Sequence, residues 1–233
     1  MKQLHQTIDS GLAIDNVLWQ ALTPSEQRNL PAHSHIFLFT PNEILFKEGD
    51  EIEYVYIVLD GKMKLTRNGV GQPQLLAILA PYDVIGQRAI IADETSTLNA
   101  SAMDNLRVLA IDRNFFTDII RSNMEICHIC MQNLAKSVSY YTIKSVNLSQ
   151  KHVRSRLAES LVSLVDKHGY ETDGITIHIY LSREELANMS NMNAANAIRT
   201  LSSFVKERIL IVDGRKIKVL DENELRRIST SGE

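Results

Sequence analysis

The apolar and polar positions of this chain follow two different patterns. Between residues 36 and 111, short apolar runs alternate with turn-rich segments such as KEGDE, RNGVGQP and APYD. Many short strands at this spacing are typical of an antiparallel sandwich or barrel. We therefore predict a β-rich region whose strands are IFLF, EILF, YVYIVL, KMKLT, QLLAIL, DVIG, LNASAM and LRVLAI.

The clearest part of this region is YVYIVLDGKMKLT, residues 54–66. An Asp-Gly dipeptide between two apolar runs is typical of a two-residue hairpin turn. We predict a tight hairpin with Asp60 and Gly61 in its turn.

Before the β-rich region, residues 12–30 are predicted to be helical. A threonine, a proline and a glutamate stand where a helix start has its N-cap, its first position and its third position. These residues are Thr23, Pro24 and Glu26.

A long helix is predicted after DRNFFTDIIRSN, because apolar or small residues recur there at alternating spacings of three and four without proline or glycine. Such a narrow line is typical of a helix that pairs with another helix. The alternative, a helix lying on its own sheet, would normally have a wider apolar stripe. We call this line the dimer seam; its residues are Met124, Cys127, Met131, Leu134, Val138, Tyr141, Ser145 and Leu148.

The C-terminal part shows a third arrangement. VRSRLAESLVSLVDKHG predicts an amphipathic helix, and two strand-like pieces, ITIHIYLS and ILIVDGRKIKVL, flank a helical segment. That segment divides into a helix at Arg183–Met189, a turn at Ser190–Met192 and a second helix from about Asn193 to Arg208. IVDGRKIKV predicts a hairpin with an Asp-Gly turn, tipped by Arg215 and Lys216.

Two helices joined by a short turn and followed by such a hairpin describe a winged helix-turn-helix. The second helix needs an apolar inner face, which is predicted to consist of Ala197, Leu201, Phe204 and Val205. It also needs a slim outer face that can enter the major groove of DNA. The residues predicted there are Asn193, Ala194, Ala195, Asn196 and Arg199.

These residue types suit direct contact with DNA. Asparagine can pair with adenine, arginine with guanine, and an alanine methyl can pack on a thymine methyl. Ser182 is expected to cap the first helix, and Arg183, Arg215 and Lys216 are expected to reach phosphates. The alternative is an ordinary solvated helix face, but this helix has no acidic residue before Glu207.

The charge distribution is compatible with this interpretation. The net charge is −3, which is unlike a protein coated for non-specific nucleic-acid binding. Residues 151–220 nevertheless hold 11 Lys and Arg against 8 Asp and Glu, whereas residues 1–150 hold 12 against 16. A basic C-terminal part beside an acidic N-terminal part fits a DNA-binding module attached to another domain.

The chain should be cytoplasmic. Its first residues have no signal-peptide core, because Asp9, Asp15 and Asn16 interrupt the apolar positions. No stretch approaches the roughly 20 apolar residues of a membrane span. The two cysteines, Cys127 and Cys130, form a C-x-x-C that could be a redox pair, but no second pair completes a metal site. We favour two small apolar residues on a helix face.

The order of these parts resembles the cyclic AMP receptor protein / fumarate-nitrate reductase regulator (CRP/FNR) superfamily. The resemblance extends from about Leu22 to Asp221 and is most specific at EILFKEGDEIEYVYIVLDGKMKL and LSREELANMSNMNAANAIRTLSSF. It implies an α+β fold with an N-terminal double-stranded β-roll sensor (1–121), a dimerisation helix (122–150) and a winged helix-turn-helix (151–233). It also implies a homodimeric transcription regulator that binds a palindromic double-stranded operator and acts with RNA polymerase.

The resemblance further implies a phosphate-binding cassette at Val84–Thr97. Cyclic AMP binders of the family carry Gly-Glu-Leu and, later, an Arg-Ser or Arg-Thr pair. Here Gly86 is kept, but Gln87 stands for the glutamate, and Ser96-Thr97 stands for the pair after a one-residue deletion. A buried phosphate would then lack its charge partner. We therefore interpret the cassette as degenerate for cyclic AMP.

Two further positions bear on the cassette. Arg88 stands where the family has an apolar residue, and it could supply its charge from another direction or pair with Asp93 or Glu94. The polar pair that contacts the base in the family aligns with Tyr141 and Thr142, so a bulky ring replaces a small hydroxyl.

Other effectors have no stronger sequence support, and the effector stays open. Iron–sulfur members need N-terminal cysteines, and none precedes Cys127. Haem members need axial ligands, but His33, His35 and His128 have no distinguishing context. No metal site and no catalytic grouping is recognisable, so we expect no enzyme.

The second helix of the helix-turn-helix also departs from the family. The family often shows a glutamate followed, four residues later, by an arginine. Here Ala195 replaces the glutamate and only Arg199 is kept. We therefore expect Asn193, Asn196 and Arg199 to contact bases and the target sequence to differ.

Overall fold

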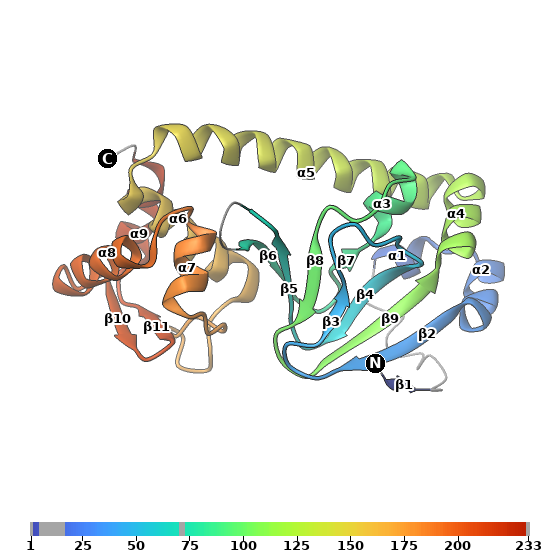
Figure 1. Ribbon diagram of the computed structural model, residues 1–233, viewed down its shortest axis with the longest axis horizontal. Coiled ribbons are helices and arrows are strands. Elements are labelled where there is room, and N and C mark those ends of the chain that lie inside the picture. The colour runs from blue at the N-terminus through green and yellow to red at the C-terminus, as the bar shows by residue number, and fades with distance from the viewer. Residues whose placement is uncertain (1, 5–16, 70–72, 232–233) are drawn as a thin grey trace. The chain divides into compact units, whose positions relative to one another are not determined.

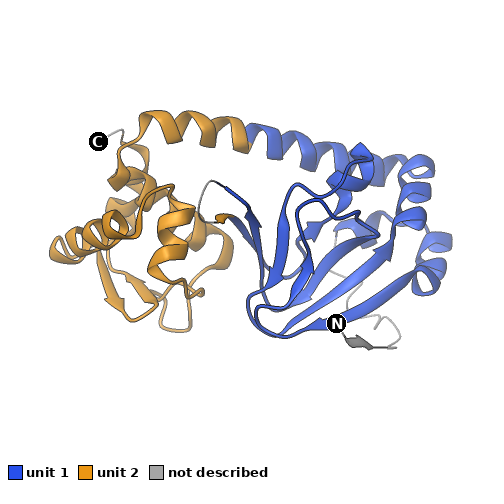
Figure 2. Cartoon of the chain, in the orientation of Figure 1, with its two compact units in different colours: residues 1–72, 76–139 blue, residues 73–75, 140–233 orange. Residues whose placement is uncertain are grey.

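The computed structural model describes residues 2–4, 17–69 and 73–231. Within it the chain forms two compact units, residues 1–72 with 76–139 and residues 73–75 with 140–233 (Figure 2). The first unit is a β-rich body with helices, and the second is mainly helical (Figure 1).

The first unit contains two sheets, as predicted from the many short apolar runs. One sheet has, in spatial order, β1 (Lys2–Leu4), β2 (Ser34–Phe39), β9 (Leu106–Asp112), β4 (Tyr54–Asp60) and β7 (Val84–Ile85). The other has β3 (Ile44–Phe46), β8 (Asn99–Ala102), β5 (Met63–Arg67) and β6 (Gln74–Leu79). Strand β9 runs antiparallel to both β2 and β4, and β8 runs antiparallel to both β3 and β5.

The core of this unit pairs large side chains with small ones. Across the β5–β8 ladder, Met63 lies opposite Ala102 and Leu65 lies opposite Ala100. All four are buried, as are Val55, Val58 and Val108 of the other sheet. Small residues opposite large ones let the buried side chains of this sheet pack closely.

The predicted Asp60–Gly61 hairpin is wrong. Strand β4 belongs to one sheet and β5 to the other, so the dipeptide forms a corner at which the chain changes sheet. Gly61 has φ +81°, and a Cβ there would lie 2.3 Å from the carbonyl oxygen of Asn105. The Asp104 carboxylate accepts the Lys62 N–H at 2.6 Å. The dipeptide specifies the turn but not which strand becomes the neighbour.

The predicted N-terminal helical region consists of short helical pieces. The structure has α1 (Val17–Ala21), α2 (Pro24–Asn29) and the 3₁₀ turn η2 (Leu30–His33). The predicted start of α2 is confirmed, because Thr23 Oγ1 accepts the Glu26 N–H at 3.3 Å and Glu26 Oε2 accepts the Thr23 N–H at 2.7 Å. The predicted helical residues 12–16 lie outside the described residues.

Helices α3 (Gln87–Ala92) and α4 (Arg113–Ser122) complete the first unit, and the predicted long helix is α5 (Met124–Gln150). Buried Asn123 fixes the start of α5, because its Oδ1 accepts the N–H groups of Glu125 and Ile126. Its amide donates to Ala21 O at 2.9 Å and to Glu26 Oε2 at 2.8 Å. Within the described ranges, no helix has the length and apolar character needed to span a membrane.

The second unit contains the predicted helix-turn-helix and hairpin. Its elements are α6 (Val153–His168), α7 (Arg183–Met189), α8 (Ala194–Lys206), β10 (Leu210–Asp213), β11 (Lys216–Val219) and α9 (Glu222–Thr230). Helix α9, which packs on α6, was not predicted.

The strand predicted at ITIHIYLS is wrong. This segment makes only isolated bridges, Tyr170 with Ile177 and Thr176 with Lys218. The Ile179 N–H donates to the Ile177 carbonyl two residues earlier, which bends the chain away from β11. Alternating apolar residues therefore mark burial of Ile177 and Ile179 but not a continuous ladder.

Candidate functional site

Helices α7 and α8 are joined by the turn that the sequence predicts. Ser182 caps α7, because its Oγ accepts the Glu185 N–H at 3.1 Å and its own N–H donates to Glu185 Oε2 at 2.8 Å. Asn191 takes the left-handed conformation with φ +49° in the turn. The Met192 N–H then donates to Ala187 O at 2.9 Å, which closes the turn before α8.

The inner face of α8 is apolar and buried. Ala197, Leu201 and Phe204 are buried, as is Thr200. Val205, which was expected on this face, is 41 % exposed. It follows Phe204 directly, and one residue turns the helix by a quarter to a third of a circle, so its side chain lies outside the buried stripe.

The outer face of α8 is exposed and carries few polar groups. Asn193 is the N-cap, and its Oδ1 accepts the Asn196 N–H at 2.8 Å. Arg199 donates from Nη2 to Asn196 Oδ1 at 2.5 Å. Ala195 and Arg199 are exposed, whereas Ala194 and Asn196 are half-buried. Four of the five predicted contact residues are thus on the first two turns, with Asn193 as their cap.

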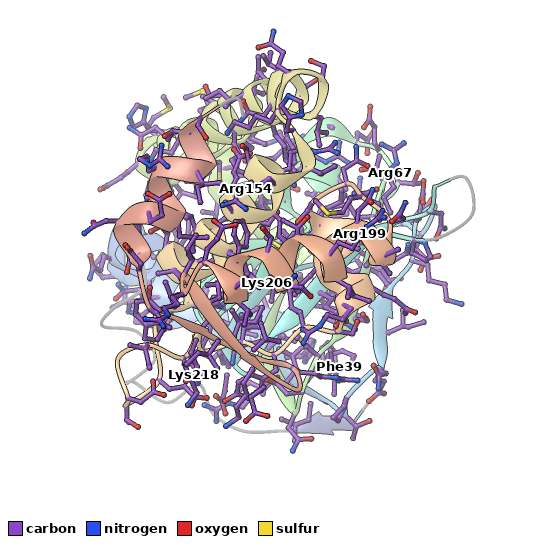
Figure 3. All side chains as sticks on the ribbon, turned by 90° about the vertical axis from the view of Figure 1, so that its left-hand side faces the viewer. Phe39, Arg67, Arg154, Arg199, Lys206 and Lys218 are labelled. Carbon is purple, nitrogen blue, oxygen red and sulfur yellow. The ribbon has the colours of Figure 1, made fainter. Side chains whose placement is uncertain are left out.

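Three exposed residues of α8 were missed by the sequence analysis. Ile198 is 48 % exposed, and Ser202 and Lys206 are exposed as well. Figure 3 shows Arg199 and Lys206 along α8. The signal that could have found them is helical spacing: Ile198 and Ser202 lie three residues after Ala195 and Arg199, and Lys206 lies four residues after Ser202.

The hairpin of β10 and β11 is confirmed, with a small correction to its turn. Asp213 pairs with Lys216, so the two loop residues are Gly214 and Arg215 rather than Asp213 and Gly214. Arg215 and Lys216 are exposed at this tip, and Lys216 Nζ lies 5.3 Å from the centre of the Tyr180 ring.

Arg183 connects the first helix of the motif to the hairpin. Its Nη2 donates to the carbonyl oxygen of Gly214 at 2.6 Å. Its Nη1 is buried and makes no hydrogen bond within the part of the chain that the structure describes. The guanidinium therefore holds the hairpin tip, and the predicted contact of Arg183 with phosphate stays a prediction.

A second arginine, missed by the sequence analysis, supports the end of α8. Arg154 of α6 donates to both oxygens of Glu207 and, at 3.1 Å, to Ser203 Oγ. Its guanidinium also lies 4.7 Å from the centre of the Phe204 ring. The hydrogen bonds that Glu207 accepts, first from Arg154 and then from Ser203 Oγ, lower the pKa of Glu207. No sequence signal could have paired residues 53 positions apart.

The segment 84–97 of the first unit forms a compact loop around α3. Gly86 precedes α3 with φ +100°, and a Cβ there would lie 2.7 Å from the carbonyl oxygen of Tyr54. Only glycine fits such a backbone without strain. The predicted residues Gly86, Gln87, Arg88, Ser96 and Thr97 are all in this loop, which we call the cassette loop.

The polar side chains of the cassette loop bond mainly to one another. Arg88 donates from Nη2 to Thr97 Oγ1 at 2.8 Å, and its Nη1 lies 3.5 Å from Glu94 Oε2. Of the two carboxylates that the sequence offered to Arg88, it therefore contacts Glu94, while Asp93 pairs with Arg113.

Ser96 is buried, and its side chain forms hydrogen bonds with the backbone of the loop. Its hydroxyl donates to Leu98 O at 2.7 Å and accepts the Leu98 N–H at 3.1 Å. Gln87 donates to Val84 O at 3.4 Å, but its Oε1 is buried without a hydrogen-bond partner among the described residues. Gln87 therefore offers one acceptor that the loop itself leaves unsatisfied.

The other two predicted effector-pocket residues belong to the second unit. Tyr141 and Thr142 lie on α5, and both are exposed there. The ring of Tyr141 lies 5.2 Å from that of Tyr140 in an edge-on contact.

The dimer seam of α5 is largely exposed. Met124 and Val138 are 73 % and 67 % exposed, Met131, Tyr141, Ser145 and Leu148 are exposed, and Cys127 and Leu134 are half-buried. A different face of α5 contributes buried Ile126 and Cys130 to the core of the first unit. The helix thus has one apolar face that its own unit buries and another that is exposed.

The cysteines and the sequence-noted histidines make the following contacts. Cys127 and Cys130 are free thiols, and burial raises the pKa of the Cys130 thiol. His33 stacks on Phe115 at 4.6 Å, and His128 contacts Gln132. In the described part of the chain, no three His, Cys, Asp or Glu side chains are grouped so that they could hold a metal.

Two family descriptions match the chain. Residues 36–123 match the "Cyclic nucleotide-binding domain", and residues 155–228 match the "Crp-like helix-turn-helix domain".

Individual relatives are distant but similar over most of their length. The "CRP-like cAMP-activated global transcriptional regulator" of Mycobacterium tuberculosis is 24 % identical over 212 residues, 90 % of this chain and 95 % of that protein. The "Global nitrogen regulator" of Synechococcus elongatus is 22 % identical over 187 residues, 78 % and 84 % of the two chains. The structure of FixK2 from Bradyrhizobium japonicum has a TM-score of 0.74 at 19 % identity, covering 85 % of this chain and 98 % of that one.

Proposed function

The chain belongs to the CRP/FNR family of DNA-binding transcription regulators, which are not enzymes, and we propose that it acts as a homodimer reading a palindromic operator with α8. The observation that carries this proposal is the outer face of α8. It is exposed, it has no carboxylate, and Arg199 stands on it beside small side chains. Such a helix can enter the major groove and bring Arg199 to a base edge.

We assign three functional regions within this proposal. Residues 1–121 form the sensor, residues 122–150 the dimerisation helix and residues 151–233 the DNA-binding domain. The base contacts come from the N-terminal half of α8, and the phosphate contacts come from exposed Arg215 and Lys216. Arg183 acts through its bond to Gly214 and positions the hairpin. RNA polymerase is the expected protein partner.

The homodimer is supported by the exposed dimer seam. Exposed apolar residues in a line with spacings of three and four are typical of a pairing helix, and CRP-family homologues bind DNA as dimers. Leu134→Glu should place a charge in this line and give monomers in sedimentation. Lys136→Glu, on an exposed position outside the seam, is the matched control and should leave the dimer intact. An unchanged Leu134→Glu dimer would contradict the seam.

DNA recognition is tested by selection from a pool of random duplexes. A two-fold dimer presents α8 twice, so the enriched sequence should be an inverted repeat with half-sites about one helical turn apart. Native mass spectrometry should find two chains for each duplex. Failure to enrich any sequence, or enrichment of a single half-site bound by one chain, would contradict the proposal.

We further propose that cyclic AMP is not the effector. At the position of the family's cassette arginine stands Ser96, whose hydroxyl bonds to the backbone of Leu98. The arginine that is present, Arg88, is engaged by Thr97 and Glu94. A cyclic phosphate bound here would have to compete with Glu94 for that charge.

A second candidate is a sensor that still binds a cyclic nucleotide through Arg88, Ser96 and Thr97. One observation favours it: Gln87 Oε1 is buried without a partner and could accept a ribose hydroxyl. Titration calorimetry with cyclic AMP and cyclic GMP separates the two candidates. Micromolar binding that Arg88→Ala abolishes would establish the second candidate, and no heat at millimolar nucleotide would exclude it.

A haem- or thiol-based sensor has weaker support. The raised pKa of Cys130 keeps its thiol protonated, which opposes a reactive thiolate. A Soret band, or DNA affinity that changes with dithiothreitol, would revive this alternative.

A further inference from the structure

Part of the outer face of α8 is apolar, and its side chains cannot form hydrogen bonds with bases. Ile198 is 48 % exposed in the second turn of the helix, whereas Ala197 and Leu201 on the inner face are buried. Ala195 is exposed one turn before Ile198. The methyl groups of these two residues therefore lie beside Arg199, on the surface assigned above to the major groove.

The asparagines of the same surface already hold hydrogen bonds within the helix. A bidentate contact to adenine uses both the oxygen and the nitrogen of one asparagine carboxamide. Asn193 Oδ1 accepts the Asn196 N–H, and Asn196 Oδ1 accepts from Arg199. Arg199 keeps further N–H donors, since a guanidinium has five. Arg199 can therefore specify guanine, and an apolar contact from the same face can add discrimination at a neighbouring base pair.

We infer that Ile198, together with Ala195, recognises the C5-methyl group of a thymine in each half-site of the operator; this inference rests on the proposed function. In the major groove, thymine presents a methyl group where the other bases present polar groups or hydrogen. An aliphatic side chain gains apolar contact with that methyl. It would desolvate the amino or carbonyl group of another base without replacing its hydrogen bond. Ile198 is thus a specificity-determining residue.

The expected effect follows from the burial of one methyl group. Removing one buried methyl group lowers affinity by about fourfold. A palindromic operator presents one such methyl group to each α8 of the dimer, so removing both lowers affinity by about 15-fold. This loss is large enough to measure and small enough to leave specific binding detectable.

The experiment uses the operator obtained by selection with the full-length dimer. The probe is the same duplex with deoxyuridine in place of thymine within both half-sites, which removes the methyl groups and keeps every hydrogen-bonding group. Fluorescence anisotropy at constant salt should show an affinity about 15-fold lower for wild type. Ile198→Ala should lose most of this preference, because only the methyl groups of Ala195 and of the new alanine remain, and a double-mutant cycle should show that the two changes are coupled.

Two controls test whether the loss of affinity comes from the half-site methyl groups and from the aliphatic side chain at position 198. Deoxyuridine outside the half-sites should change nothing, and Ile198→Val should keep most of the preference for thymine. Ile198 is exposed on a helix and alanine is the best helix former, so Ile198→Ala should fold, which circular dichroism would verify.

The inference is overturned if wild type binds the thymine and deoxyuridine duplexes equally, or if Ile198→Ala keeps the preference. A selected operator without thymine in its half-sites would overturn it as well. In all these cases an enriched operator leaves the proposed DNA binding intact. If no sequence is enriched, both the inference and the proposed function fail.

Discussion

The outer face of α8 and the cassette loop contain similar residue types in opposite situations. On α8, Arg199 is exposed and makes one hydrogen bond, to its neighbour Asn196. In the cassette loop, Arg88 contacts both Thr97 and Glu94, and the Ser96 hydroxyl is held by the backbone of Leu98. Arg199 keeps most of its N–H donors for a ligand, so the chemistry of its surface suggests one. The cassette loop engages its arginine and its serine internally and leaves only Gln87 Oε1 without a partner among the described residues, which is why the operator contacts are easier to infer than the effector.

The largest expected loss of stability is at a glycine of the cassette loop, and a glycine of the β10–β11 hairpin near α8 is the comparison. Gly86→Ala should destabilise the protein by about 3 kcal/mol, because a Cβ would lie 2.7 Å from Tyr54 O at a backbone φ of +100°. Gly214→Ala in the hairpin should cost only about 1 kcal/mol, because its Cβ would meet nothing within 4 Å. Urea denaturation measures both. Equal costs would mean that the cassette loop is not tightly packed on the sheet.

The two arginines should separate the regions functionally. Arg199→Ala should weaken specific operator binding about tenfold to 100-fold, since a bidentate guanine contact is lost. Arg88→Ala, the matched control, should leave operator affinity unchanged. Anisotropy titrations at fixed salt provide the measurement. If the Arg199→Ala protein keeps wild-type specificity, the claim that α8 recognises bases is wrong.

The buried serine of the cassette loop should have a structural role. Ser96→Ala removes a hydroxyl that both donates to and accepts from Leu98, and it should cost about 1–2 kcal/mol of stability. Ser202→Ala on the exposed face of α8 is the control and should change stability by less than about 0.5 kcal/mol. If the two variants are equally stable, the Ser96 hydroxyl is free for a ligand.

Asn193, which directly precedes α8, should act as the N-cap of that helix. Asn193→Ala should cost about 1 kcal/mol of stability because its side chain satisfies the Asn196 N–H. Asn193→Ser should retain that stability, as serine is also a good N-cap. Loss of operator specificity in this stable variant would support the predicted base contact of Asn193, and unchanged specificity would contradict it.

The smallest effect concerns the turn before the DNA-binding helices. Hydrogen bonds from Thr176 and Ile175 lower the pKa of Asp173 to about 2. A lowered folded-state pKa stabilises the protein above the unfolded pKa, and this stabilisation is lost as the pH falls from about 4 to 2. Asp173→Asn should therefore be less stable than wild type at pH 6, with a difference that shrinks on acidification.

The sequence predicted the C-terminal unit better than the β-rich unit. Capping residues, helical spacing and a hairpin dipeptide are local signals, so Arg183–Met189 was predicted with its observed bounds. The partner of a strand is not a local property, and the Asp60–Gly61 corner therefore looked like a hairpin. The segment at ITIHIYLS failed for the same reason, since burial alternates there although the segment meets β11 only at an isolated bridge.

The candidate site shows the same contrast between features that local sequence predicts and features that depend on tertiary contacts. Residue type and spacing identified Arg199, Arg215 and Lys216, because a solvent-facing position on α8 or the hairpin follows from the helix period and the turn. The supporting contacts of Arg154 with Glu207 and of Arg183 with Gly214 join residues far apart in sequence. They depend on tertiary packing, which no spacing rule contains.

The most direct test of the account is the affinity of the wild-type dimer for the selected inverted repeat against a scrambled duplex of the same composition and length. The account predicts, at physiological salt, binding to the inverted repeat tighter by about 10³-fold or more. Equal affinity for the two duplexes would mean that the protein binds only the phosphate backbone, and it would contradict base recognition by α8.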